Sequence, residues 1–168
     1  MKKLVIAIVI IVLGVVGFVI FKSFTDFDLI YRYGRWAKNE LNTFNQTYTK
    51  DMVNRPSVRV KMKLSYSELN DIRQRLDELD FFNEVTSFNE ALKKENEEIK
   101  KRGWMPLWRS HCSSFYLKIR IESEVKEINW NDCGKTSDKA TRFSIYMNRI
   151  IESQKEYKKL PTPTAGYL

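Results

Sequence analysis

The sequence has little of what catalytic centres and disulfide-rich domains use: one histidine, two cysteines, six glycines and four prolines in 168 residues. The single histidine, His111, precedes Cys112, and neighbouring strand residues point to opposite faces, which excludes this pair as base and nucleophile. No glycine-rich phosphate loop or G-x-S-x-G motif occurs. With 30% charged and 13% aromatic residues, the composition excludes disordered and collagen-like chains, so we expect a folded domain.

A long hydrophobic run opens the chain. Of the 18 residues at positions 4–21, 16 are hydrophobic and the other two are Gly14 and Gly17. As a helix this run spans about 27 Å, close to the thickness of the hydrocarbon core of a bilayer. A cleaved signal peptide is the alternative, but its apolar part is normally shorter and ends at small residues, which positions 19–24 lack. The sequence therefore predicts an uncleaved membrane anchor over residues 1–24.

Charge gives the orientation of this anchor only weakly. Basic residues flank the run on both sides: Lys2 and Lys3 before it, and Lys22, Arg32 and Arg35 after it. A short basic N-terminus ahead of one apolar segment is typical of a signal anchor, which predicts a cytoplasmic N-terminus and an exported domain. The net charge is +8, and setting Lys2 and Lys3 aside leaves +6 for residues 22–168. This balance suggests a location near anionic lipid or polymer, but it is also a common feature of soluble domains, which is the more ordinary interpretation.

Residues 25–168 predict one extracytoplasmic α+β domain with an antiparallel sheet and about three helices, because strand patterns come first and helix patterns follow. Hydrophobic residues alternate with polar ones over positions 27–33, more weakly over 41–49, and most clearly over 58–64. In the last of these, alternation also predicts a basic row in water on the outer face of the sheet.

Helix starts are indicated by two capping-box signatures: Ser65 with Glu68, and Ser87 with Glu90. The first helix should reach Asp80, with the Phe81–Phe82 pair packing against its end. The second should end at Gly103, a typical helix stop. Apolar residues at helical spacing predict a third helix over residues 140–151.

A hairpin is predicted by strand patterns at residues 115–121 and 128–130, which flank a polar break. A turn centred on residues 122–123 would place Cys112 opposite Cys133. Strand ends can bring such partners within disulfide range, and an exported domain lies where disulfides persist. Two free thiols, or a register shifted by two residues, are the alternatives.

Tryptophans gather beside basic residues between positions 100 and 109. The members of this basic–tryptophan segment are Lys100, Lys101, Arg102, Trp104, Met105, Leu107, Trp108 and Arg109. Amphipathic indoles beside cations suit anionic lipid headgroups or an anionic envelope polymer. The alternative is that the tryptophans fold back into the core after Gly103. Nucleic acid is not an expected partner, because the domain is predicted to be exported.

Several segments resemble a group of small uncharacterised membrane-anchored or secreted proteins of Gram-positive spore-forming bacteria. The resemblance covers most of residues 30–168, and the segments that carry it lie at positions 33–34, 38–44, 48–52, 64–65, 80–83, 156–161 and 166–168. The resemblance implies an extracytoplasmic location and the same strand, helix, hairpin and helix order, but no activity. Cys112 and Cys133 are a departure from the group, so the disulfide is inferred from this chain alone.

No residue pattern indicates a cofactor, a metal site or a catalytic set. We therefore expect a non-enzymatic binding module at the cell envelope, held by the membrane through residues 4–21. The alternative is an enzyme that acts on an envelope component. A deep pocket holding two close carboxylates, or His111, would favour that alternative.

Overall fold

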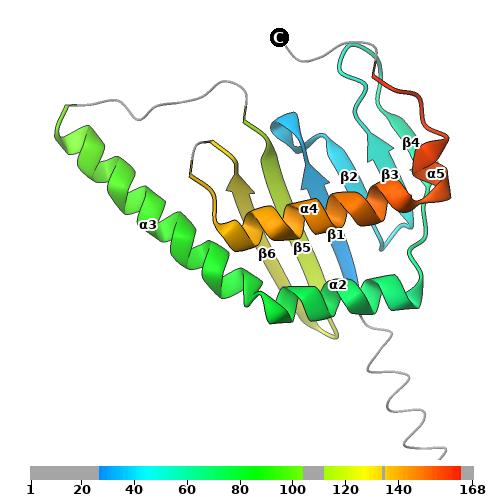
Figure 1. The fold of residues 1–168 in the computed structure, drawn as a ribbon, viewed down its shortest axis with the longest axis horizontal. Helices are drawn as coiled ribbons and strands as arrows, with labels where there is room; N and C mark the ends of the chain where they lie inside the picture. Colours follow the sequence, from blue (N-terminus) through cyan, green and yellow to red (C-terminus); the bar gives the residue numbers. More distant parts are fainter. Residues whose placement is uncertain (1–26, 104–111, 134, 164–168) are drawn as a thin grey trace, which may run out of the picture.

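The computed structural model describes residues 27–103, 112–133 and 135–163 of the chain. Within these ranges the protein is an α+β domain with one six-stranded sheet, four α-helices and one 3-10 turn (Figure 1). The elements in chain order are β1 (Phe27–Tyr33), η1 (Arg35–Ala37), β2 (Asn39–Asn42), β3 (Thr47–Lys50), β4 (Val58–Lys61), α2 (Tyr66–Glu78), α3 (Phe81–Lys101), β5 (Ser114–Ile121), β6 (Glu124–Asn131), α4 (Asp138–Ser153) and α5 (Lys155–Lys158).

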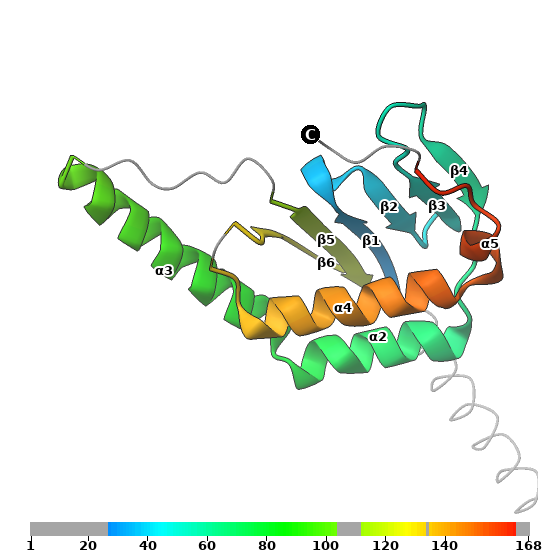
Figure 2. The same ribbon diagram turned by 45° about the horizontal axis from the view of Figure 1, so that its top comes forward.

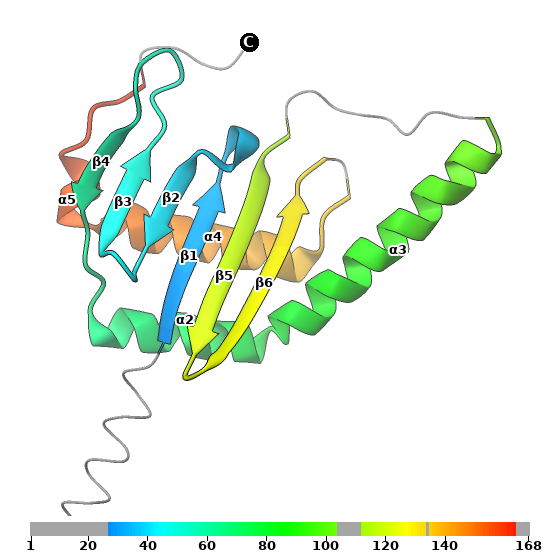
Figure 3. The same cartoon turned by 180° about the vertical axis from the view of Figure 1, so that it is seen from behind.

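The sheet has the strand order β4-β3-β2-β1-β5-β6, and every neighbouring pair is antiparallel. Helices α2 and α4 lie across one face (Figures 1 and 2). Seen from behind, the strands lie in front and no described helix covers them (Figure 3). The domain therefore has two layers, and one face of its sheet is open.

The core lies between the sheet and the two helices. Because side chains alternate along a strand, Leu29 and Tyr31 of β1 face the helices together with Leu41 and Leu117 of the neighbouring strands, and all four are fully buried. Helix α4 buries one stripe against them, spaced at three and four residues: Ala140, Phe143, Ser144, Met147 and Ile151. The helix that this periodicity predicted over residues 140–151 is confirmed.

The open face of the sheet is polar, and ion pairs cross its strands. Arg32 contacts Glu40, Lys118 contacts Glu127 and Arg120 contacts Asp28, each at 2.6 Å. Each pair joins residues that lie opposite one another in the strand register. These half-exposed pairs contribute little stability individually, but they neutralise the three carboxylates of this face.

Several sequence predictions are confirmed. The strand over residues 27–33 is β1, and the basic row of β4 is exposed at Arg59 and Lys61. The β5–β6 hairpin turns at residues 122–123, so that Phe115 lies opposite Trp130, as the predicted register requires. The capping box of Ser65 and Glu68 is formed at the start of α2.

Three boundaries were predicted wrongly, and the first is that of the strand expected over residues 58–64, which is β4 and ends at Lys61. The expected strand over residues 41–49 is two strands, β2 and β3, because the chain turns at residues 43–46, where the Gln46 amide donates to the Thr43 carbonyl at 3.2 Å and Gln46 has a φ of 52°. The expected capping box at Ser87 does not form, because α3 already begins at Phe81, whose buried side chain attaches the first turn to the core. The fourth helix, α5, is a single turn that the sequence pattern did not indicate.

No helix within the described ranges is both long and apolar enough to span a membrane. The predicted anchor at residues 4–21 lies outside the described residues, so it remains a prediction.

Candidate functional site at the distal edge of the sheet

The distal edge is the end of the sheet where β1 ends and β5 begins. It comprises the β1–β2 turn (residues 33–39) and the outer ends of the β5–β6 hairpin (residues 112–114 and 131–133). A hydrogen bond joins its two parts, because the Ser114 amide donates to the Gly34 carbonyl at 2.9 Å. The opposite end of the sheet holds Phe27, where the described chain begins, and the hairpin turn.

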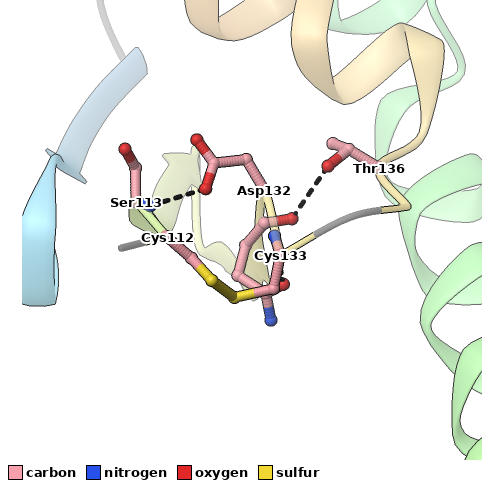
Figure 4. The surroundings of a disulfide bond; sticks show 6 residues. Cys112, Ser113, Asp132, Cys133 and Thr136 are labelled. Atoms are coloured by element: carbon pink, nitrogen blue, oxygen red, sulfur yellow. Dashed lines mark hydrogen bonds between the residues drawn. A yellow bond between two sulfur atoms is a disulfide. The ribbon is translucent and has the colours of Figure 1, made fainter. Parts of the chain in front are cut away.

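A disulfide closes the hairpin at the distal edge. Cys112 and Cys133 are bonded at an S–S distance of 2.09 Å, and their Cα atoms are 5.0 Å apart (Figure 4). They lie just beyond the last paired residues, Ser114 and Asn131. The Ser113 amide donates to the Asp132 carboxylate beside the bridge. The pairing of the strands thus places the two cysteines opposite each other at bonding distance.

The β1–β2 turn presents Trp36 to solvent on a left-handed backbone. Trp36 and Ala37 have φ values of 57° and 52°, and Gly34 has a φ of 87°. Each non-glycine residue in this conformation costs roughly 1–2 kcal/mol. The Trp36 side chain is nevertheless 61% exposed, the largest exposure among the described large hydrophobic residues. The strain is therefore not offset by burial of the indole ring.

Hydrogen bonds fix the backbone of this turn. The Gly34 carbonyl accepts from the amides of Ala37 and Ser114, both at 2.9 Å. The Asn39 side chain donates to the Tyr33 carbonyl at 3.3 Å and accepts from the Asp51 amide at 3.0 Å. The turn is thus tied to two other segments, at Ser114 and Asp51, and these bonds hold the backbone of Trp36 in one place.

The electrostatics of the turn are basic. The Arg35 guanidinium lies 4.5 Å from the centre of the Trp36 ring, and the Lys38 ammonium lies 4.9 Å from it. Both distances are typical of cation–π contacts. Below the turn, the hydroxyls of Tyr33 and Tyr48 are 2.7 Å apart. Burial raises the pKa of both tyrosines well above the ordinary value, so the two hydroxyls below the turn stay uncharged.

The basic–tryptophan segment falls partly within the described chain. Lys100, Lys101 and Arg102 are exposed at the end of α3. From Asn89, whose side chain donates to the Asn129 carbonyl at the edge of the sheet, α3 continues for twelve residues, or about 18 Å. It diverges sideways from the sheet beyond β6, so that its C-terminal end lies apart from the β1–β2 turn in every view (Figures 1, 2 and 3). Three other residues of the predicted contact set, Trp104, Trp108 and Arg109, lie outside the described residues.

A small cavity lies at the end of the sheet opposite the distal edge, and it bears on whether the protein is an enzyme. Its volume is about 190 Å³, and its lining includes two carboxylates, Asp77 and Asp80, with Arg73 and Lys126. Pockets for drug-sized ligands measure about 300–1,000 Å³, so only a small molecule would fit. Within the described ranges, no three residues of the metal-binding types come together as a metal site.

Sequence reasoning missed the Trp36 turn. Its signal was the sequence Gly34-Arg35-Trp36-Ala37-Lys38 between two strands, which places an aromatic residue in a loop among cations. Loops carry function more often than the elements that they connect. The chain matches no protein-family model and no curated protein.

Replacing Gly34 with alanine should lower the free energy of unfolding by about 2 kcal/mol. Its φ is unfavourable for a side chain, and a Cβ atom would lie 2.7 Å from the Asn39 side-chain nitrogen. Chemical denaturation of the full chain measures this loss. Gly103→Ala is the matched control, because Gly103 has a φ of 77° but open space around it. Equal losses at both sites would contradict a role for the Asn39 contact.

Proposed function

We propose that the protein is a single-pass, membrane-anchored domain outside the cytoplasm, which binds a partner at the cell envelope through its distal edge. The anchor is residues 4–21, and the domain is residues 25–168. This role agrees with the resemblance to membrane-anchored or secreted proteins of Gram-positive spore-forming bacteria.

The presentation of Trp36 carries the proposal. A large aromatic side chain that is 61% exposed is unusual, and here the backbone beneath it is strained and fixed by hydrogen bonds. Strained backbone of this kind concentrates at binding and catalytic sites. Tryptophan and arginine are also the side chains that most often dominate binding energy at interfaces. A rigid, exposed Trp36 beside Arg35 is therefore better suited to binding than to folding.

The disulfide supports the proposed location. Disulfides persist in oxidising compartments and are rare in the reducing cytosol. The bridge between Cys112 and Cys133 closes the distal edge, so oxidising conditions outside the cytoplasm would keep the two ends of the hairpin together.

The cavity lined by Asp77 and Asp80 favours an enzyme as the second candidate. Two carboxylates can act as general acid and base when their surroundings separate their pKa values. A double variant, Asp77→Asn with Asp80→Asn, separates the two functions. It should abolish turnover of an envelope component by an enzyme, and leave attachment of a binding module to isolated cell envelopes unchanged.

Protease treatment of intact cells that express the full chain with a C-terminal epitope tag tests the proposed topology. Added protease should remove the tag while a cytoplasmic marker protein stays intact. Alkaline extraction of membranes should leave the untreated chain in the membrane pellet. Survival of the tag on intact cells, with its loss after lysis, would contradict an exported domain.

A further inference from the structure

We infer that strand β4 binds an extended peptide segment of a partner protein, which adds to the sheet as an antiparallel strand and alternates acidic with apolar residues. The surface is the β4 edge, residues 58–63. It is separate from the distal edge, so this inference goes beyond the proposed function and does not rest on it.

The backbone of the β4 edge is open. β4 is the outermost strand on its side of the sheet (Figure 3). Just after it, the Met62 amide donates to the Gln46 carbonyl at 2.9 Å, so Met62 turns its backbone toward β3. Successive residues of an antiparallel strand turn their N–H and C=O groups to opposite sides, so Arg59 and Lys61 turn theirs outward. Among the described residues these groups have no hydrogen-bond partner, and such a row is a template for strand addition.

The other edge of the sheet, β6, is partly covered by its own chain. The Asn129 carbonyl accepts a hydrogen bond from the Asn89 side chain of α3 at 2.8 Å, and the Asn131 carbonyl accepts one from the Thr136 hydroxyl at 3.1 Å. At the β4 edge, α5 lies behind the sheet (Figure 3), and in the described part of the chain it forms no hydrogen bond with β4. Backbone pairing is therefore more accessible at β4.

Positive charge gathers along the β4 edge without carboxylates to neutralise it. Residues 52–67 contain no acidic residue and four basic ones, all exposed: Arg55, Arg59, Lys61 and Lys63. Within the described ranges none of the four forms an ion pair, and the Arg59 Nε atom donates to the neutral Thr49 hydroxyl at 3.1 Å. By contrast, the three ion pairs that cross the open face of the sheet each neutralise a cation of β1 or β5.

This charge selects the occupant. Opposite charges that face each other across two strands are favourable, and like charges are unfavourable. Acidic residues of an added strand would lie opposite Arg59 and Lys61, whereas the residues between them would lie beside the half-buried Val58 and Val60, where apolar side chains fit. A second copy of this chain is disfavoured, because two paired β4 strands would bring their cations together.

Fluorescence anisotropy with the full chain in detergent micelles tests the inference, and the probe is a short fluorescein-labelled peptide that alternates glutamate and valine. We expect saturable binding, and none when lysine replaces glutamate. Arg59→Glu with Lys61→Glu should weaken binding at least tenfold, because carboxylates would then face carboxylates. The matched control is Lys93→Glu with Lys94→Glu, which makes the same change of charge on exposed residues of α3 and should leave the affinity unchanged.

A second comparison isolates the backbone. Lys61→Ala and Lys61→Pro both remove the charge, but proline also removes the outward amide, and an edge strand accepts proline at such a position. Lys61→Pro should therefore bind the peptide several-fold more weakly than Lys61→Ala. On the peptide, the glutamate amides would face β4 in an antiparallel pair, so their N-methylation should weaken binding, and N-methylation of the valines should have little effect.

Four results would overturn the inference. Wild-type affinity in Arg59→Glu with Lys61→Glu, with the variant folded by circular dichroism, would exclude the β4 edge. Equal affinities of Lys61→Pro and Lys61→Ala, or of the two N-methylated peptides, would reduce the contact to charge alone. Equally tight binding of polygalacturonate that depends on the same two cations would assign the edge to an anionic polysaccharide. Self-association of the full chain that Arg59→Glu with Lys61→Glu abolishes would assign it to a second copy.

Discussion

Replacing Phe81 with alanine is expected to lower the free energy of unfolding by about 3–5 kcal/mol, the largest loss that we predict for a single substitution. Phe81 is 1% exposed, and its ring centre lies 4.6 Å from that of Phe143 and 5.3 Å from that of Trp130. It begins α3 and joins that helix to both α4 and β6. Its removal would leave a cavity where these three elements meet, and α3 would lose one of its two buried residues.

Urea denaturation of the full chain in detergent, followed by near-ultraviolet circular dichroism, measures the loss. Phe82→Ala is the matched control, since Phe82 is the neighbouring ring, only partly buried, at 5.7 Å from Phe81. Phe82→Ala should lower the free energy of unfolding clearly less than Phe81→Ala does. Similar losses for the two variants would mean that Phe81 does not hold the three elements together.

Removal of the Cys112–Cys133 disulfide should lower the free energy of unfolding by about 3 kcal/mol. The bridge joins residues that are 21 positions apart, and closing a loop of this length restricts the unfolded chain by about that amount. The double variant Cys112→Ala with Cys133→Ala should therefore unfold at lower denaturant concentration. The m-value should also change, because the unfolded chain is no longer cross-linked.

Reductant provides the internal control for this prediction. Dithiothreitol should destabilise the wild-type chain by about the same amount and leave the double variant unchanged. If dithiothreitol left the unfolding midpoint of the wild-type chain unchanged, the bridge would have no part in holding the distal edge.

The regular part of the fold could be predicted from the sequence, because it depends on periodicity. Alternation identified β1, and helical spacing identified α4. The hairpin register followed from one assumption about the turn, and it put Cys112 and Cys133 opposite each other. These features depend on local spacing, which a single sequence contains.

The failures have tertiary causes. Ser87 with Glu90 satisfies the local rule for a helix start, but the burial of Phe81 and Val85 extends α3 toward the core. The turn between β2 and β3 is attached to β1 by a hydrogen bond between Thr43 and Leu29, fourteen residues apart. Local patterns do not report such contacts.

The candidate site was predicted only in part for a related reason. Trp36 has a left-handed backbone, which sequence patterns assign to glycine or asparagine rather than to tryptophan. Its conformation depends on Ser114 and on Asn39, which other strands and loops position. The basic–tryptophan segment was easier to recognise because its residues are consecutive, yet its described cations lie on a projecting helix, apart from Trp36.

The thiol state of the full chain, isolated from cells under acid quench and alkylated without reductant, tests the central claim most directly. That claim is an exported domain whose distal edge is closed by a disulfide. Mass spectrometry should find no alkylated cysteine before reduction, and alkylation of both Cys112 and Cys133 after it. Two alkylated cysteines in the unreduced protein would contradict both the bridge and the oxidising location that it supports.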